Sequence, residues 1–457
     1  MLESFFIDSH RLACFVENIE KRLVLENKTI QDISYIFRKE MEKGLAGEES
    51  SLAMLPAHIS RAQLCEKEER YPLYYLAIDL GGTNVRALKV CLESPKSKPK
   101  ILFHLESEIR RNIITSSKGE DLFDFVAGKL KSLLLESGDW NSGRSFVLGL
   151  TFSFSFEQNT MNSGRILSLS KGFCAKDLVH KDPVKLLESS LKKYDICNVR
   201  VGAILNDATG TFLTGMRHPD CDGGVILGTG FNICVDMPIQ FIVKKTHPFF
   251  GKKMVVVQES GNFDMTKVGI STEFDREVDL FSENPGKHLA EKMMSGKYLG
   301  GIFYFMIESF SILQEARFPF KKDRFFSTKC LSEIEEASSF GSKERINDLF
   351  RRHHLNIQVS SHKDSQQIRK LCSLISTRSA NLLVAFVLGS IQMMDSKLLN
   401  NHMLAIDGSI YKKYFGFKKR VCDSLEAFSK GKISMREVED GSGIGAALAA
   451  AVSDMRE

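Results

Sequence analysis

The sequence predicts an α/β protein folded into two lobes, and three observations support this prediction. The chain has 457 residues, more than one small core accommodates, and 43% of them are hydrophobic. Apolar strands alternate with a helix over residues 73–153, which is typical of an α/β lobe. Two glycine-rich turns, at residues 81–83 and 228–230, each lie between apolar strands. One turn is expected in each lobe.

Two amphipathic helices are predicted at the start of the chain. Apolar residues recur at helical spacing from Leu12 to Leu23. A second helix follows Thr29 and Asp32, which resemble a helix cap, and is expected to end near Gly44.

The first glycine-rich turn follows a buried strand and precedes a second strand, within residues 74–90. Adjacent glycines permit positive φ angles that aim successive N–H groups into a concavity suited to phosphate. A hydroxyl, an amide and a guanidinium follow the turn, and a carboxylate ends the first strand, where it could hold a metal ion that accompanies phosphates. These residues are Asp79, Gly81, Gly82, Thr83, Asn84 and Arg86. For this stretch alone, an ordinary hairpin remains the alternative.

Two further elements complete the first lobe. A helix begins at residues 119–126, with acidic residues in the first turn, where the helix dipole favours them. The apolar run 146–153 is suited to a buried parallel strand.

The end of the next apolar strand carries a candidate general base. Asn206 and Asp207 follow the apolar run 201–205 and precede small residues that start a helix. Strand ends line the cleft of an α/β lobe, so a carboxylate there suits proton transfer. The alternative is that Asp207 caps the helix through the amides of Thr209 or Gly210.

The second glycine-rich turn, Gly228-Thr229-Gly230, has the same arrangement as the first. It follows an apolar strand, and its N–H groups and hydroxyl can hold phosphate oxygens. Together the two turns suggest lobes that hold opposite sides of one nucleotide. Two later glycine clusters, 407–409 and 441–443, could supply the flat backbone surface that a purine needs, although each alone reads as a loop. Residues 310–370 are expected to be mostly helical, and a small-residue helix is predicted over 446–452.

The charge of the chain argues against a nucleic-acid partner. Lysine and arginine total 62 against 57 acidic residues, a formal net charge of +5, and the basic residues are scattered along the chain. A nucleic-acid-binding surface concentrates basic residues in a stripe with aromatic residues among them.

The N-terminus and the apolar runs predict a soluble, cytoplasmic protein without a membrane span. The first apolar residues are interrupted by Asp8, His10 and Arg11, which makes a poor signal peptide. The longest apolar run, 382–389, is much shorter than a membrane span. The ten cysteines stand singly, and we expect reduced core residues rather than disulfides or a zinc site. The oligomeric state is left open.

These motifs, taken in order, resemble the eukaryotic hexokinases and glucokinases of the actin-like ATPase superfold. The resemblance runs from residues 37–45 to 439–443 and includes stretches 275–279, 284–286, 291–293 and 375–380. It implies an α/β fold of two lobes, each on a mixed five-stranded sheet, with a central nucleotide and sugar cleft. The small lobe would comprise 71–208 and 439–457, and the large lobe 1–70 and 209–438.

The resemblance also implies the reaction and its residues: transfer of the γ-phosphoryl group of Mg-ATP to the 6-hydroxyl of glucose or a related hexose, possibly mannose or fructose, as the first step of glycolysis. Asp207 would be the catalytic base, and Lys171 would place positive charge near the transferred group. The sugar would be bound by Ser153, Ser170, Lys171, Asn206, Asp207, Asn232, Glu259 and Glu291. Beyond the first turn, ATP would contact Gly228, Thr229, Gly230, Gly296, Lys297, Gly408 and Ser409. Asp79 would reach magnesium through water.

Four positions depart from the family pattern. Ser155 stands where proline is usual, Ala208 and Ser170 where threonine is usual, and His288 where a glutamine touches the sugar. None removes a charged catalytic group, so we expect an active enzyme with altered sugar affinity or selectivity. The alternatives are a glucose-binding regulator without catalysis and a kinase for an amino sugar or another polyol.

Overall fold

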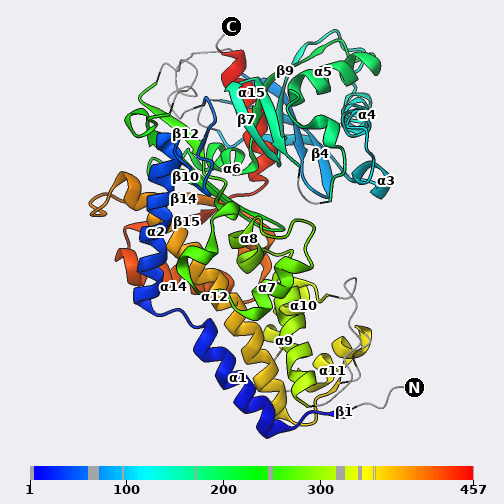
Figure 1. Ribbon diagram of the computed structural model, residues 1–457. Helices are drawn as coiled ribbons and strands as arrows, with labels where there is room; N and C mark the ends of the chain where they lie inside the picture. Colours follow the sequence, from blue (N-terminus) through cyan, green and yellow to red (C-terminus); the bar gives the residue numbers. More distant parts are fainter. Residues whose placement is uncertain are drawn as a thin grey trace.

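The chain forms two mixed β-sheets with helices packed around and between them, shown in the computed structural model of Figure 1. The structure describes residues 5–59, 71–94, 97–169, 172–244, 251–314, 325–337, 342–353, 355 and 357–455.

The first sheet has five strands in the order β5-β4-β3-β6-β9. They are β3 (Leu73–Leu80), β4 (Asn84–Leu92), β5 (Lys100–Glu108), β6 (Phe146–Phe152) and β9 (Val199–Leu205). The first three form an antiparallel meander, and β6 and β9 then extend the sheet in parallel with β3. Every residue of β6 is buried, which confirms the predicted buried parallel strand.

The second sheet has six strands in the order β15-β14-β10-β11-β12-β2. They are β2 (Leu55–Pro56), β10 (Cys221–Leu227), β11 (Phe231–Pro238), β12 (Lys253–Val257), β14 (His402–Asp407) and β15 (Ile433–Glu437). Without β2 the sheet repeats the topology of the first, an antiparallel meander extended by two parallel strands. The expectation of five strands in each lobe is therefore wrong by one short strand, which pairs with the edge of β12. Two smaller sheets pair β1 (Phe5–Phe6) with β13 (Ile357–Gln358) and β7 (Ser155–Thr160) with β8 (Ser163–Ser168).

Both N-terminal helices are present, as α1 (Ser9–Leu23) and α2 (Asn27–Ala46). One detail of the second was predicted wrongly, because Thr29 lies within α2 and does not cap it. The helix ends at Ala46, near Gly44 as predicted, and is followed by Gly47 with the left-handed φ of 81°. Gly44 is needed for packing, because a Cβ there would lie 2.3 Å from the Leu52 carbonyl oxygen.

The helices that separate the two sheets are α6 (Asp207–Gly215) and α15 (Gly441–Asp454). α15 packs against α6 and against strands of the first sheet, whereas α6 also packs against β10 and β14 of the second (Figure 1). The two helices approach closely at two glycines, since a Cβ on Gly445 would lie 2.2 Å from the Gly210 carbonyl oxygen. The small-residue helix predicted at the C-terminus thus lies between the first sheet and α6.

The remaining helices pack against the sheets or against one another. Those near the first sheet are α3 (Arg111–Ile114), α4 (Glu120–Glu136) and α5 (Pro183–Lys193). Those near the second are α7 (Glu273–Leu280), α8 (Leu289–Met294), α9 (Leu299–Leu313), α10 (Thr328–Glu336), α11 (Ser342–Arg352), α12 (His362–Met394), α13 (Ser409–Lys413) and α14 (Phe417–Ser429). The described part of 310–370 is mostly helical, as expected.

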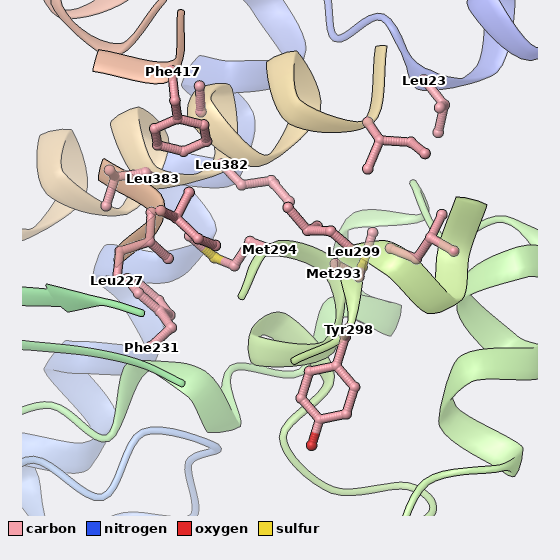
Figure 2. Packing of buried hydrophobic residues seen from close by; sticks show 14 of the residues in the cluster. Leu23, Leu227, Phe231, Met293, Met294, Tyr298, Leu299, Leu382, Leu383 and Phe417 are labelled. Atoms are coloured by element: carbon pink, nitrogen blue, oxygen red, sulfur yellow. The ribbon is translucent and has the colours of Figure 1, made fainter. Parts of the chain in front are cut away.

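The long helix α12 forms the centre of the larger core. Leu382 and Leu383 of α12 pack with Phe417 of α14, and Leu383 lies near Leu227 and Phe231 at the ends of β10 and β11 (Figure 2). Within the described residues, α12 alone is long and apolar enough to cross a membrane by length and composition, and most of that stretch is buried inside the protein. Counting uninterrupted apolar residues missed this property, because polar residues interrupt the apolar ones along α12.

The nine described cysteines are all free. Cys91, Cys221, Cys234 and Cys372 are buried, as expected of core residues. Cys14, Cys174, Cys197 and Cys422 are exposed, so the expectation is wrong for these four.

Candidate active site

A cleft of about 320 Å³ lies between the two sheets and is lined by residues from both. Many residues that the sequence singled out line this cleft. They are Asp79, Gly81, Gly82, Thr83, Asn84, Arg86, Ser153, Asn206, Asp207, Thr229, Gly230, Asn232, Glu259, Glu291 and Gly408. The fold therefore brings to one cavity groups that are spread over more than three hundred residues of sequence.

The first glycine-rich turn joins β3 to β4, with Leu80 opposite Val85 across the antiparallel pair. The Gly81 N–H donates to the Asn84 carbonyl at 3.0 Å, which closes the turn. Neither Gly81 nor Gly82 adopts a positive φ, so that part of the prediction is wrong. The turn reaches the cleft because β3 and β4 end there.

Asp79 and Arg86 hold each other at the end of this hairpin. The Arg86 guanidinium donates to Asp79 Oδ2, with Nε at 3.1 Å, and its Nη1 lies 2.7 Å from Asp440 Oδ1. Ser442 bridges the pair: its Oγ donates to Asp79 Oδ2 at 2.8 Å and accepts from Arg86 Nη2 at 2.8 Å. Arg86 thus forms ion pairs with two carboxylates in this structure. Its predicted contact with phosphate remains a prediction.

The second glycine-rich turn joins β10 to β11 and is supported by two neighbouring segments. The Gly228 carbonyl accepts from Gly296 N–H at 2.7 Å, and the Thr229 carbonyl accepts from Lys297 N–H at 3.2 Å. Gly408 packs against the same turn with φ of 125°, and a Cβ there would lie 2.2 Å from the Leu227 carbonyl oxygen. The predicted nucleotide residues of this lobe therefore form one connected backbone surface.

Behind this surface, apolar side chains fix the turn. Leu227 and Phe231 flank it and pack with Met294 of α8 and Leu383 of α12 (Figure 2). The Phe231 and Phe386 ring centroids lie 5.7 Å apart. The position of the turn is thus set by the larger core.

Asn206, and not Asp207, caps helix α6. Its Oδ1 accepts from the Ala208 N–H at 2.9 Å. Asp207 lies in the first turn of the helix, where its Oδ1 accepts from the same N–H at 2.9 Å. The alternative that Asp207 caps the helix through the amides of Thr209 or Gly210 is therefore wrong. The cap is Asn206, and the amide that Asp207 contacts is that of Ala208.

Asn232 and two glutamates form a polar wall of the cleft that Asp207 also lines. Asn232 Nδ2 donates to Glu259 Oε1 at 3.1 Å, and Asn232 Oδ1 accepts from the Ser260 N–H at 3.1 Å. Glu291 Oε2 accepts from the Phe231 N–H at 3.0 Å. These bonds fix the carboxylates before any substrate arrives, as a selective polar site requires.

Glu259 has an unusual pKa. Burial raises the pKa of its carboxyl group to about 7, the charges of Asp207 and Glu291 add to this effect, and hydrogen bonds from Asn232 and Ser155 oppose it. Ser155, one of the positions expected to depart from the family pattern, thus supplies a hydrogen-bond donor to Glu259.

Three residues that are not glycine adopt left-handed backbone angles around the cleft. Glu259 has φ of 58°, His288 of 54° and Asp440 of 48°. Such conformations cost about 1 to 3 kcal/mol each and cluster at functional sites.

Other predicted residues lie away from the cleft or outside the described residues. Lys297 Nζ forms an ion pair with Glu283 at 2.8 Å. Ser409 lies behind Gly228, at the N-terminus of α13. Ser170 and Lys171 lie outside the described residues.

Several residues of the cleft, among them Asp407 and Ser442, were missed as site residues. Asp407 ends β14, where its Oδ1 forms an ion pair with Lys412 Nζ at 2.6 Å and its Oδ2 accepts from the Gly441 N–H at 2.8 Å. It follows the same Leu-Ala-Ile sequence that precedes Asp79, a signal that could have identified it. Ser442, by contrast, has no local signal for its contact with Asp79.

The fold and the cleft define a class of enzyme: a two-lobed α/β phosphotransferase with a glycine-rich turn from each sheet and a carboxylate at a strand end. Family models described as hexokinase match residues 15–216 and 222–452. Hexokinase-2 of Solanum tuberosum is 32% identical over 96% of this chain and 91% of its own length. Hexokinase-2 of Saccharomyces cerevisiae is 30% identical over 96% of this chain and 92% of its own length. The chain belongs to the hexokinase family, which confirms the resemblance.

Solved structures agree with this membership. A hexokinase from Schistosoma mansoni complexed with glucose has a TM-score of 0.84 and 27% identity, covering 97% of this chain and 100% of that one. A second hexokinase crystal structure has a TM-score of 0.78 and 26% identity, covering 97% and 99% of the two chains. The predicted two-lobed hexokinase fold and the prediction of an ATP-dependent sugar kinase are confirmed. The lobe boundaries and the individual site residues remain predictions.

Proposed function

We propose that the cleft binds glucose and Mg-ATP together and that the enzyme transfers the γ-phosphoryl group to the 6-hydroxyl of the sugar. The observation that carries this proposal is the single cavity shared by the Asp207 carboxylate, a wall of amides and carboxylates, and both glycine-rich turns.

The polar wall suits a hexose. A sugar ring presents hydroxyl groups that both donate and accept hydrogen bonds, and amides and carboxylates match such groups. Asn206, Asn232, Glu259 and Glu291 come from four different segments, so they surround a small ligand. Mannose and fructose carry the same kinds of groups, and we propose them as weaker substrates.

The residues also fit Mg-ATP. Bound magnesium would supply positive charge that neutralises the phosphates. Magnesium prefers oxygen ligands and commonly keeps several waters. Asp79 and Asp407 present carboxylates to the cleft from the ends of two strands. Gly230 and Gly408 keep side chains out of the surface between them, because a Cβ on Gly230 would lie 2.6 Å from Glu291 Oε2.

Phosphoryl transfer requires little covalent chemistry from the protein. Asp207 orients the 6-hydroxyl and accepts its proton late, because the transition state of phosphoryl transfer is loose. Lys171 is proposed to add positive charge near the transferred group. The two lobes exclude water, the competing acceptor, when the sugar is present.

We also propose a cytoplasmic location. Free cysteines, four of them exposed, fit a reducing compartment. Fractionation of cells with an antibody against the chain tests this proposal.

The direct test of the function is ADP formation by the full chain with Mg-ATP, with and without glucose, and identification of the product by NMR. We expect a rate that depends on glucose and a sugar phosphorylated at its 6-hydroxyl. Saturable glucose binding without ADP formation would favour the non-catalytic regulator. A higher kcat/KM for an amino sugar than for any hexose would favour the other alternative.

A further inference from the structure

A second and larger cavity, of about 820 Å³, lies beside the sugar cleft on the large lobe. It is formed by the segment that follows Glu259, by α7, and by the 281–288 loop that connects α7 to α8. Its volume is in the range of cavities that hold nucleotide-sized ligands. The predicted sugar and nucleotide residues are absent from its walls.

The floor of this cavity is apolar. Met265, Leu289 and Met293 lie in its wall; Leu289 is partly exposed, whereas Met265 and Met293 are covered by neighbouring protein atoms. Methionine side chains adapt their shape to ligands of different outline, so this floor suits the apolar body of an organic molecule.

Two cations at the rim of the cavity have no side-chain partner in the part of the chain that the structure describes. Two charged pairs at the cavity are internally satisfied: Asp279 with Lys292, whose atoms Oδ1 and Nζ lie 2.6 Å apart, and Asp275 with Arg378. Arg276 and Lys287, by contrast, are exposed and form no ion pair or side-chain hydrogen bond within the described residues.

The third acid at the cavity, Asp264, does not compensate these cations. Its Oδ1 accepts from the Thr266 N–H at 3.0 Å and from the Thr266 hydroxyl at 2.7 Å, within its own turn. An anionic group is therefore the complement that Arg276 and Lys287 lack.

The cavity is connected to the sugar site through two shared residues. Asn262 and His288 line both cavities. His288 holds the left-handed φ of 54° at the start of α8, the helix that carries Glu291. The loop before it is fastened to α7, because the Gly286 N–H donates to Asp279 Oδ1 and Oδ2 at 3.0 Å each.

We propose that this cavity, defined by Met265, Arg276, Lys287, His288, Leu289 and Met293, binds an organic anion with an apolar body and that its occupant tightens sugar binding. The ligand's anionic group would pair with Arg276 and Lys287, and its body would lie against Leu289 and the adjacent methionines. It would hold the 281–288 loop in the arrangement seen, and so keep Glu291 in place before the sugar arrives. The regulatory part rests on the proposed function, whereas binding of the anion does not.

The probe for this test is 1-anilinonaphthalene-8-sulfonate, whose fluorescence rises on binding, and its uncharged analogue N-phenyl-1-naphthylamine. Both are titrated into the full-length protein. The variant Arg276→Glu/Lys287→Glu reverses the two rim charges, and Lys28→Glu/Lys363→Glu makes the same change at two exposed lysines on α2 and α12. Thermal unfolding confirms that each variant is folded.

We expect saturable binding of the sulfonate to the wild type and the control variant, and weakening by about tenfold or more in the rim variant. The uncharged analogue should bind much more weakly than the sulfonate and respond little to charge reversal. No saturable binding, or equal binding by the rim variant and the wild type, would overturn the proposed site.

Coupling between the anion site and the sugar site is tested by binding measurements alone, with each ligand titrated in the presence of the other. A saturating sulfonate concentration should lower the glucose dissociation constant by about fivefold, and glucose should tighten the sulfonate by the same factor, because coupling free energies are reciprocal. Unchanged or weakened glucose binding would overturn the regulatory part. If the wild type forms no ADP with glucose but sulfonate and glucose still tighten each other's binding, the proposed function is contradicted and the proposed anion site is not.

Discussion

The Ser442 hydroxyl lies 2.8 Å from Asp79 Oδ2. This contact connects the C-terminal helix α15 to the end of β3, although the two residues are far apart in the sequence. Ser442 also accepts from Arg86 at 2.8 Å, and its carbonyl accepts from the Thr151 hydroxyl at 2.8 Å. The carboxylate proposed to act on magnesium through water is thus oriented by a helix that lies between the first sheet and α6.

Replacing Ser442 by alanine should raise the KM for Mg-ATP by about fivefold, because a hydrogen bond of this kind contributes about 1 kcal/mol. The KM for glucose should change little. Steady-state kinetics at varied magnesium concentration measure both. Ser189→Ala is the control, since that hydroxyl bonds only to the Lys185 carbonyl of its own helix. A glucose KM that rises as much as the Mg-ATP KM would contradict the assigned role of Ser442.

The close crossing of α6 and α15 should not tolerate a side chain at Gly445. The Cβ of Gly445→Ala would lie 2.2 Å from the Gly210 carbonyl oxygen, so the helices must separate. We expect a loss of about 1 to 3 kcal/mol in the free energy of unfolding, together with lower kcat. Urea denaturation measures the first and ADP formation the second.

Gly128→Ala is the matched control within α4. Its Cβ would lie at an ordinary 3.4 Å from the Tyr194 ring, so this variant should be neutral or stabilised by up to about 1 kcal/mol. Equal effects of the two substitutions would show that helix propensity, and not the crossing, explains Gly445.

A buried ion pair stabilises the start of α7. Arg378 Nη1 and Nη2 donate to the two Asp275 oxygens at 2.8 and 2.6 Å, and the arginine side chain is 0% exposed. Arg378→Met should lower the free energy of unfolding by about 3 to 5 kcal/mol, because it leaves a carboxylate buried without its partner. Adding Asp275→Asn should recover part of this loss in urea denaturation. If the double variant is less stable than Arg378→Met, the unpaired charge is not the cause.

The pKa of Glu259 makes stability depend on pH. Its folded pKa of about 7 lies above the ordinary value of 4.5, so the native state binds more protons between these pH values. The wild type should therefore lose stability as pH rises from 5 to 8, and Glu259→Gln should not share this loss. The quantity to compare is the free energy of unfolding of Glu259→Gln minus that of the wild type. This difference should be about 1 to 3 kcal/mol more positive at pH 8 than at pH 5.

The same substitution should weaken glucose binding most above pH 7, where the wild-type carboxylate is ionised and accepts hydrogen bonds. Urea denaturation and calorimetric titration with glucose at pH 5 and pH 8 measure the two effects. A stability difference that stays constant over this range would mean that the Glu259 pKa is ordinary.

Much of the fold was predictable because its signals are local. The hairpin around Gly81, the buried strand 146–152 and the helix rich in alanine at the C-terminus all follow from residue patterns within a few positions. The shared topology of the two sheets was not visible, since strand order depends on distant pairings that a non-repeating sequence does not reveal.

The residues that line the cleft were more predictable than the contacts they make. Asp79 and Arg86 were expected to face a ligand, yet their partners Asp440 and Ser442 come from the opposite end of the chain. The left-handed glycine at the nucleotide surface is Gly408 and not Gly81, because the close approach of Leu227 imposes that geometry. Such constraints arise from packing, which local patterns do not encode.

The most direct test of the proposed reaction is glucose-dependent ADP formation by Asp207→Asn, with glucose binding measured calorimetrically on the same sample. The proposal predicts that kcat falls by a factor of about 10² to 10⁴, whereas glucose still binds, because the amide keeps the shape of the side chain but cannot accept the proton. A kcat within a few-fold of the wild type, with glucose binding intact, would contradict the role of Asp207 as the catalytic base.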